Sequence, residues 1–266
     1  MSANFHTHTT FCDGKQTPEE IVRTAVEQGF SAIGLSGHGY TPFDLRYCMQ
    51  DTEGYIAEVK RIKEKYRDKI DVLLGVEEDC FAPVDRERFE YIIGSCHYVC
   101  IDGVYYPIDS SYDHFKRCLD VFDGDILRLA ETYFTTFVDY IRRRKPDIVG
   151  HFDVITKFDQ VDVARFSCSN EYVALARRYA ALAAQSGCVF EVNTGPVWRG
   201  FRTTPLPNAE VLYELKRLDV PVILSSDSHS VDTLGFATEE MRAYLKDIGF
   251  RYTVTLTRDG FAREEL

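Results

Sequence analysis

The sequence predicts an α/β fold in which seven parallel strands close into a barrel surrounded by helices. Seven short apolar runs alternate with longer segments of helical periodicity along the 266 residues, and such alternation is typical of a parallel sheet. The runs are nearly continuously apolar, and closure into a barrel removes the two exposed edges that an open sheet would keep. With 45% hydrophobic residues, the chain fits one large domain, which we expect to span residues 1–266.

The expected strands begin almost at the first residue and recur along most of the chain. Each is a short apolar run that is followed by a polar or turn-forming stretch. They cover residues 3–7, 32–36, 71–77, 91–97, 147–151, 188–193 and 221–227.

The first expected helix, within residues 17–30, has the clearest start signal. Thr17 is a good N-cap, Pro18 suits the first helical position, and Glu20 completes a capping box. Three further helices are expected within residues 123–145, 170–187 and 208–218.

A dense basic run, RRRK, ends the helix expected within residues 123–145. Cations are favourable at a helix C-terminus, and Pro146 would stop the helix there. We therefore prefer a helix end to the alternative, a phosphate site.

Composition excludes several classes of protein. The formal net charge of −11 offers no basic face for nucleic acid. No apolar stretch of membrane-spanning length and no signal-peptide pattern is present, so we expect a soluble, cytoplasmic protein. Eight cysteines without a CxxC pair indicate reduced thiols.

Six of the seven histidines fall at or just beyond the ends of the expected strands, and only His114 does not. In a β/α barrel the carboxyl ends of the strands converge on one face, where active sites are built. A single HxH pair would be weak evidence, but the recurrence at strand ends predicts a shared site. The histidines and the acidic residues that join them are His6, His8, His38, His97, His151, His229, Asp13, Glu77 and Asp227.

Nine potential ligands exceed the four that one tetrahedral zinc takes, so we expect two or three divalent ions. Imidazole and carboxylate without thiolate suit Zn, Fe, Mn or Co and do not select one of them. Side chains at i and i+2 of a strand point the same way, so His6 and His8 can hold one ion together. Glu77, at the end of a buried strand, is the best candidate to bridge two ions.

The sequence resembles the PHP (polymerase and histidinol phosphatase) family, and within it the histidinol-phosphatase branch. The resemblance runs from about residue 4 to about residue 236 and rests on seven short motifs. They are HTHT, SGHGY, GVEED, GSCHYV, GHFDVITKF, EVNTG and SSDSH.

This resemblance implies a distorted (β/α)7 barrel with a trinuclear metal centre at the carboxyl ends of its strands. It implies that His6, His8, Glu77 and Asp227 hold one ion. Glu77 would bridge to a second ion completed by His97 and His151, and Asp13, His38 and His229 would hold the third.

Two positions depart from the family pattern, and at a third the alignment with the pattern allows two residues. Many histidinol phosphatases have a histidine where this chain has Gly14, so Asp13 is assigned in its place. Gly37 replaces a common aspartate, which predicts a missing contact beside the metal ligands. A slip of one residue from Glu77 to Glu78 also remains open.

We expect a metal-dependent phosphomonoesterase that hydrolyses L-histidinol phosphate by attack of a metal-activated hydroxide. Glu77, Asp227 and His229 are the expected catalytic residues. Arg199 and Lys157 are expected to bind substrate, although each could be a surface cation. The alternatives are a PHP phosphatase for a nucleotide, a sugar phosphate or phosphotyrosine, and a metal-binding module without catalysis. We expect a small phosphoester as partner, neither nucleic acid nor membrane, and leave the oligomeric state open.

Overall fold

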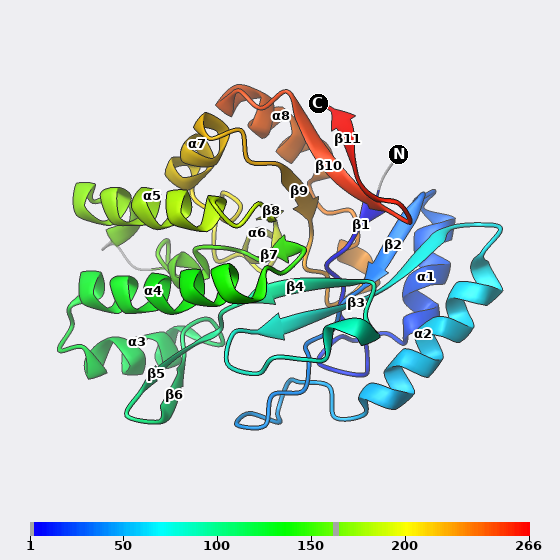
Figure 1. Cartoon of the computed structure of the whole chain (residues 1–266), viewed down its shortest axis with the longest axis horizontal. Helices are drawn as coiled ribbons and strands as arrows, with labels where there is room; N and C mark the ends of the chain where they lie inside the picture. Colours follow the sequence, from blue (N-terminus) through cyan, green and yellow to red (C-terminus); the bar gives the residue numbers. More distant parts are fainter. Residues whose placement is uncertain (1–2, 162–164) are drawn as a thin grey trace.

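Seven parallel strands form the central sheet of the computed structural model, which describes residues 3–161 and 165–266. All seven predicted strands are present, and their order along the sheet follows their order in the chain (Figure 1). They are β1 (Ala3–Asn4), β2 (Ala32–Leu35), β3 (Asp71–Asp79), β4 (Tyr91–Ser95), β7 (Ile148–Val149), β8 (Val189–Asn193) and β9 (Val222–Ser225).

The sheet curls into a nearly closed barrel, as the sequence predicts. The two outer strands, β1 and β9, share no ladder among the described residues, and the chain just beyond them joins them instead. The backbone N–H of His8 donates to the carbonyl of Ser228 at 2.8 Å, and the N–H of Ser228 donates to the carbonyl of His6 at 3.1 Å. Closure therefore takes place at the level where the predicted site residues begin.

Helices surround the barrel, with α1 and α2 at one end of the view in Figure 1 and α4 and α5 at the other. The helices expected within 17–30, 123–145, 170–187 and 208–218 are confirmed as α1, α4, α5 and α7, and the others were not predicted. The full set is α1 (Pro18–Glu27), α2 (Thr52–Tyr66), α3 (Tyr112–Val121), α4 (Ile126–Arg144), α5 (Asn170–Ala184), α6 (Gly195–Trp198), α7 (Ala209–Arg217) and α8 (Thr238–Ile248), with short 3-10 turns at Arg86–Arg88, Val154–Thr156, Phe166–Cys168 and Val231–Thr233.

The predicted helix ends are present in the structure. Thr17 caps α1, and Glu20 completes the capping box by accepting from the Thr17 backbone N–H at 2.9 Å. The basic run ends α4, where Lys145 adopts a left-handed conformation with φ 48° directly before Pro146. The run therefore belongs to a helix terminus, as expected.

Two hairpins were not predicted. One, β5 (Tyr98–Ile101) with β6 (Val104–Pro107), follows β4 and projects beside α3. The other, β10 (Tyr252–Thr257) with β11 (Gly260–Glu265), ends the chain beside β1 and β9 (Figure 1). Val254 and Leu256 of β10 are buried in the same apolar cluster as inward-facing residues of the barrel strands, so this hairpin fills one end of the barrel.

Successive side chains of β3 point alternately into the barrel and toward the helices outside it. Leu73 packs in the barrel interior, whereas Val72 and Leu74 pack outward in the cluster beneath α1 and α2. Because side chains alternate with period two, the inward row continues to Glu77 and Asp79 at the carboxyl end of the strand. The barrel is therefore apolar at one end and polar at the other.

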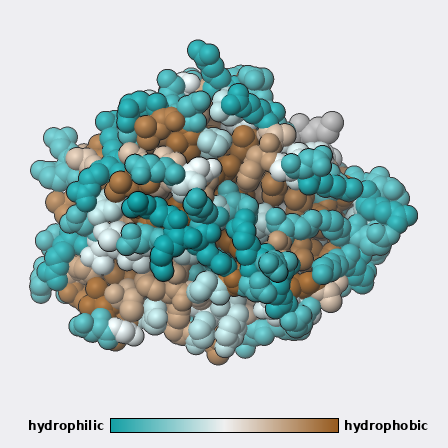
Figure 2. Space-filling view, viewed as in Figure 1, coloured by the Kyte–Doolittle hydropathy of each residue, from teal (hydrophilic) through white to brown (hydrophobic). Residues whose placement is uncertain are grey.

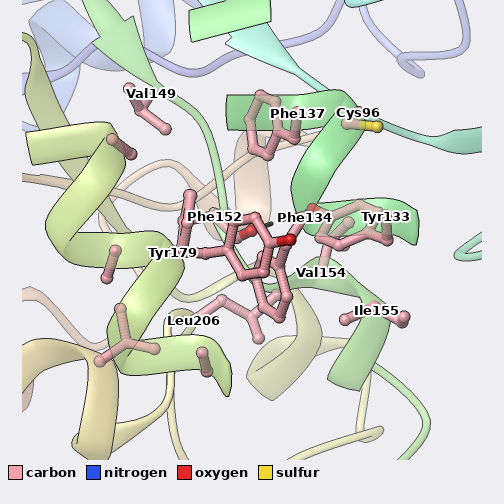
Figure 3. Packing of buried hydrophobic residues seen from close by; sticks show 14 of the residues in the cluster. Cys96, Tyr133, Phe134, Phe137, Val149, Phe152, Val154, Ile155, Tyr179 and Leu206 are labelled. Carbon is pink, nitrogen blue, oxygen red and sulfur yellow. Dashed lines mark hydrogen bonds between the residues drawn. The ribbon is translucent and has the colours of Figure 1, made fainter. Parts of the chain in front are cut away.

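A second apolar cluster supports the polar end from outside. Phe152 lies directly after His151 and packs against Phe134 and Phe137 of α4, at ring distances of 5.3 and 5.8 Å (Figure 3). The hydroxyl of Tyr133 donates to the carbonyl of Phe152 at 3.0 Å. These contacts fix the backbone next to one of the predicted ligands.

Polar side chains predominate on the face shown in Figure 2, with hydrophobic residues visible between them. In the described part of the chain, none of the helices has the length and apolar character needed to cross a bilayer.

Candidate metal centre

All nine predicted ligand residues meet at the polar end of the barrel. Their potential ligand atoms form four overlapping groups, and within each group the atoms lie within 4.8 Å of one another. The groups are His8, Asp13, His38 and His229; His6, Glu77 and His151; His6, His8 and Asp227; and His38, Glu77 and His97. Residues that are up to 223 positions apart in the sequence are therefore neighbours in space.

Glu77 lies at the centre of this arrangement and is 2% exposed. Its Oε1 lies 2.9 Å from Nε2 of His151 and 3.1 Å from Nε2 of His97. Its Oε2 lies 3.3 Å from Nε2 of His6 and 2.8 Å from Nδ1 of His38. Each carboxylate oxygen thus faces a different set of imidazoles, which is the arrangement that a bridging carboxylate requires.

Asp13 gathers a second set of imidazoles at the outer side of the cluster. Its carboxylate lies 3.3 Å from Nε2 of His229, 3.7 Å from Nε2 of His38 and 3.5 Å from Nδ1 of His8. Asp13 therefore lies beside His38 and His229, the two residues with which the resemblance groups it.

Asp227 approaches the N-terminal histidines from the opposite edge of the sheet. Its Oδ1 lies 3.2 Å from Nε2 of His8 and 3.8 Å from Nε2 of His6. Asp227 has φ 49°, in the left-handed region that aspartate tolerates better than most residues. A residue held in such a conformation after a strand is common at functional sites.

Several atoms in the cluster make no hydrogen bond to the described part of the chain. They include Nε2 of His6, Nε2 of His8 and Oε2 of Glu77, all buried. A buried polar atom without a partner costs free energy, so an unpaired convergent set indicates a missing partner. Divalent cations are the partners that suit imidazole nitrogen and carboxylate oxygen. The residues present therefore fit a group of metal ions.

A one-residue slip in GVEED does not occur. Glu78 points away from the cluster, and its carboxylate accepts hydrogen bonds from Tyr140 at 2.7 Å and from Arg144 at 2.7 and 2.8 Å. Strand alternation thus places Glu77 inside the barrel and Glu78 outside it.

Mutual electrostatics shift the pKa values of the clustered groups in opposite directions. Burial would raise the pKa of Glu77, but the imidazoles of His38, His6 and His97 hold it well below its usual value. Burial would lower the pKa of His6, yet the carboxylates of Glu191, Glu77 and Asp227 raise it to about 10. Burial and the nearby His8 lower the pKa of His229 to about 4. The carboxylates are therefore ionised and able to act as ligands.

A cavity of about 460 Å³ opens directly over the cluster. Its outer wall comes from the unpredicted hairpin and the segments around it, and includes Tyr47, Tyr98, Asp109 and His114. His114 was expected to lie away from the site because it follows no strand. It does lie on α3, but that helix begins beside the cavity, and hydroxyls of Ser110 and Ser111 lie 2.7 and 2.9 Å from its Nδ1.

Both predicted substrate-binding cations line this cavity. The guanidinium of Arg199 donates to Oδ2 of Asp227 at 3.1 Å and lies 2.8 Å from Nδ1 of His229. The ammonium of Lys157 donates to the carbonyl of Asp109 at 2.6 Å. Neither is an isolated surface cation, since the two side chains are 18% and 13% exposed.

Two carboxylates beside the cluster were missed by the sequence reasoning. Oδ2 of Asp79 accepts from the backbone N–H of His97 and lies 3.1 Å from its Nδ1. Glu191 lies 2.5 Å from Nδ1 of His6. The signal was present in both cases, because each is a charged residue at an inward-facing position of a buried strand.

The replacement of aspartate by Gly37 has a local explanation. A Cβ atom at this position would lie 2.7 Å from Sγ of Cys12. That thiol is itself 3.6 Å from Nδ1 of His8. The space beside the cluster is therefore taken by Cys12.

Known proteins resemble this chain along most of its length. The family model for the PHP domain matches residues 4–195. A Schizosaccharomyces pombe protein named "Probable histidinol-phosphatase" is 27% identical over 272 residues, which cover 94% of this chain and 87% of that protein. The histidinol-phosphatase of Bacillus subtilis is 24% identical, over 88% of this chain and 96% of its own.

The solved structures show the same fold. Histidinol phosphate phosphatase from Lactococcus lactis, in a complex with zinc, L-histidinol and phosphate, has a TM-score of 0.70 with 18% sequence identity, and 98% of each chain is covered. The predicted barrel class is thereby confirmed.

Proposed function

This chain belongs to the PHP domain family, and we propose that it hydrolyses L-histidinol phosphate to L-histidinol and phosphate, a step of histidine biosynthesis. The observation that carries the proposal is the buried group of nine histidine, aspartate and glutamate side chains, with unpaired nitrogen and oxygen atoms, at the base of a cavity. The names of the relatives support the choice of substrate.

The proposed ligands of two or three divalent ions are the nine residues of the cluster, and Glu77 serves more than one ion. When bound, such ions neutralise phosphate oxygens and lower the pKa of a water molecule, which makes hydroxide available near neutral pH. Asp227 and His229 are proposed as catalytic residues together with Glu77, because they border both the cluster and the cavity. Zn, Fe, Mn and Co all suit this donor set.

Arg199 and Lys157 are the proposed phosphate-binding cations. The guanidinium of Arg199 is oriented by Asp227, and a planar fork of donors matches the oxygens of a phosphate. Lys157 also lines the cavity, where the backbone carbonyl of Asp109 accepts from its ammonium group. The two cations would keep the phosphate over the cluster.

The outer part of the cavity is proposed to receive the organic half of the substrate. L-Histidinol carries an ammonium group and an imidazole, both of which need hydrogen-bonding partners once they leave water. Asp109 and His114 offer such partners on the cavity wall.

We propose that the enzyme acts in the cytoplasm as one catalytic unit over its whole length.

The proposal is tested by phosphate release from L-histidinol phosphate beside a nucleotide, a sugar phosphate and phosphotyrosine, with protein whose metals have been counted by elemental analysis. We expect turnover that strongly favours L-histidinol phosphate. Growth of a strain that lacks histidinol phosphatase should be restored by the same gene. Fully metallated protein that ignores L-histidinol phosphate and cleaves another ester would overturn the substrate assignment.

A further inference from the structure

Glu191 occupies a position inside the barrel to which no role has been given above. It lies on β8 and is 1% exposed. Its side chain points into the barrel, as do those of Val189 toward the apolar end and Asn193 toward the cluster. The inward row places the carboxylate between the apolar end of the barrel and the cluster.

Every accepting position of this carboxylate is in use. Its Oε1 accepts from Nδ1 of His6 at 2.5 Å and from the hydroxyl of Ser225. Its Oε2 accepts from the backbone N–H of His151 at 2.7 Å and from the side-chain amide of Asn193 at 2.9 Å. Four donors, two on β8 and β9 and two just after β1 and β7, therefore converge on one side chain.

The contact with His6 determines which imidazole nitrogen carries the proton. A carboxylate can only accept, so Nδ1 of His6 must be the protonated nitrogen. In the neutral imidazole, the form that binds a metal ion, Nε2 then carries the lone pair and faces the cluster, where it makes no hydrogen bond to the described residues. Through the backbone N–H, the same carboxylate also fixes the start of the segment that carries His151.

We propose that Glu191 is a positioning residue that orients His6 and His151 for metal binding without touching substrate. This inference rests on the metal centre of the proposed function. Partners that orient a ligating histidine commonly raise metal affinity by about 10- to 100-fold. A glutamine is a poor replacement for this glutamate. Its NH₂ group would either face the backbone N–H of His151 and the side-chain amide of Asn193, which are donors, or face His6 and favour the tautomer with the proton on Nε2, the nitrogen that faces the cluster.

Glu78 provides a matched control in the same molecule. It is also fully buried at 0% exposure, and it also accepts four hydrogen bonds, from Tyr140, Val84 and twice from Arg144. It lies on the outer side of β3, away from the cluster. Loss of either carboxylate should destabilise the fold, but only the loss of Glu191 should weaken metal binding.

The test compares Glu191→Gln with Glu78→Gln by zinc affinity, measured in competition with a chelator, and by the thermal midpoint of the metal-free protein. We expect Glu191→Gln to bind zinc about 10- to 100-fold more weakly, with kcat restored by excess zinc. Glu78→Gln should lower the thermal midpoint and keep the zinc affinity of the unaltered chain. Should Glu191→Gln fail to fold, Glu191→Asp and Glu78→Asp repeat the comparison, with a smaller loss of zinc affinity expected in Glu191→Asp alone.

Unchanged zinc affinity in the Glu191 variants would overturn the inference, and so would an equal loss in the Glu78 variants. The zinc affinities alone decide the role of Glu191. A chain that binds zinc tightly and releases no phosphate from L-histidinol phosphate would overturn only the proposed function.

Discussion

Glu77 owes its central place to the two-residue period of β3. The strand places Leu73 in the apolar interior of the barrel and Glu77 four residues further along the same row, among imidazoles that follow four other strands. A buried carboxylate surrounded by imidazoles is the kind of ligand set that divalent cations bind.

Replacement of Glu77 by alanine should therefore remove metal and activity together. One side chain faces His6 and His38 with one oxygen and His97 and His151 with the other, so more than one ion loses a ligand. We expect kcat/KM to fall by more than the roughly 10- to 100-fold typical of a residue that only orients a ligand. Elemental analysis and phosphate release from one preparation would measure both effects, and wild-type turnover would refute the bridging role.

His114→Ala serves as the contrasting variant on the cavity wall. His114 belongs to none of the groups of potential ligands, so metal content should stay unchanged. Because its ring lines the cavity, we expect KM for L-histidinol phosphate to rise about tenfold, the effect of losing roughly one hydrogen bond, with a smaller change in kcat. A loss of bound metal in this variant would show that its role differs from the one assigned here.

Residues at strand ends could be predicted from sequence, whereas residues that act through their neighbours were missed. The nine members of the cluster lie at or beyond the carboxyl ends of expected strands and carry metal-binding side chains. Glu191 lies in the middle of a strand, and only the inward direction of its side chain distinguishes it. His114 reaches the cavity because α3 begins beside it, and that contact depends on a hairpin with no clear sequence pattern.

The C-terminal hairpin is the element that completes the apolar end of the barrel. Val254 and Leu256 are each 7% exposed and pack with Phe5, Tyr91 and inward-facing residues of other strands. Tyr91 fills the space left by two glycines, since a Cβ at Gly34 or Gly75 would collide with its ring. The hairpin and this ring together support the layer on which the cluster is built.

Leu256→Ala should destabilise the protein while its metal centre stays intact. Removal of a buried leucine side chain typically costs about 2–5 kcal/mol, depending on how far the site collapses. Denaturant unfolding of the metal-loaded protein would measure the loss. Phe261→Ala, on the partner strand and 39% exposed, should change stability little, and similar losses in both variants would contradict the packing described here.

The seven strands and four of the helices could be predicted because their signals are local. The apolar runs and the Thr17 capping box each specify their structure within a few residues. The two hairpins could not be predicted in the same way. Val104 and Tyr105 of β6 are exposed at 51% and 36%, so that strand has no buried face to impose a pattern, and the burial of Val254 depends on strands far away in the sequence.

Barrel closure brings the segments that follow the first and last strands of the sheet into one site. His6 and His8 follow β1, Asp227 follows β9, and backbone hydrogen bonds between residues 6–8 and Ser228 join them. The formal net charge is −11, which would repel a phosphate dianion over long distances. Bound cations would reverse that effect locally, so acidic composition and an anionic substrate are compatible.

The most direct test is a metal titration of the metal-free chain, with bound ions and turnover of L-histidinol phosphate measured on the same samples. We expect a strictly metal-dependent reaction, with no turnover in the absence of metal and a rise in turnover that levels off at two or three ions per chain. Full turnover by a chain that holds no metal would contradict it, as would a fully loaded chain that hydrolyses no phosphoester.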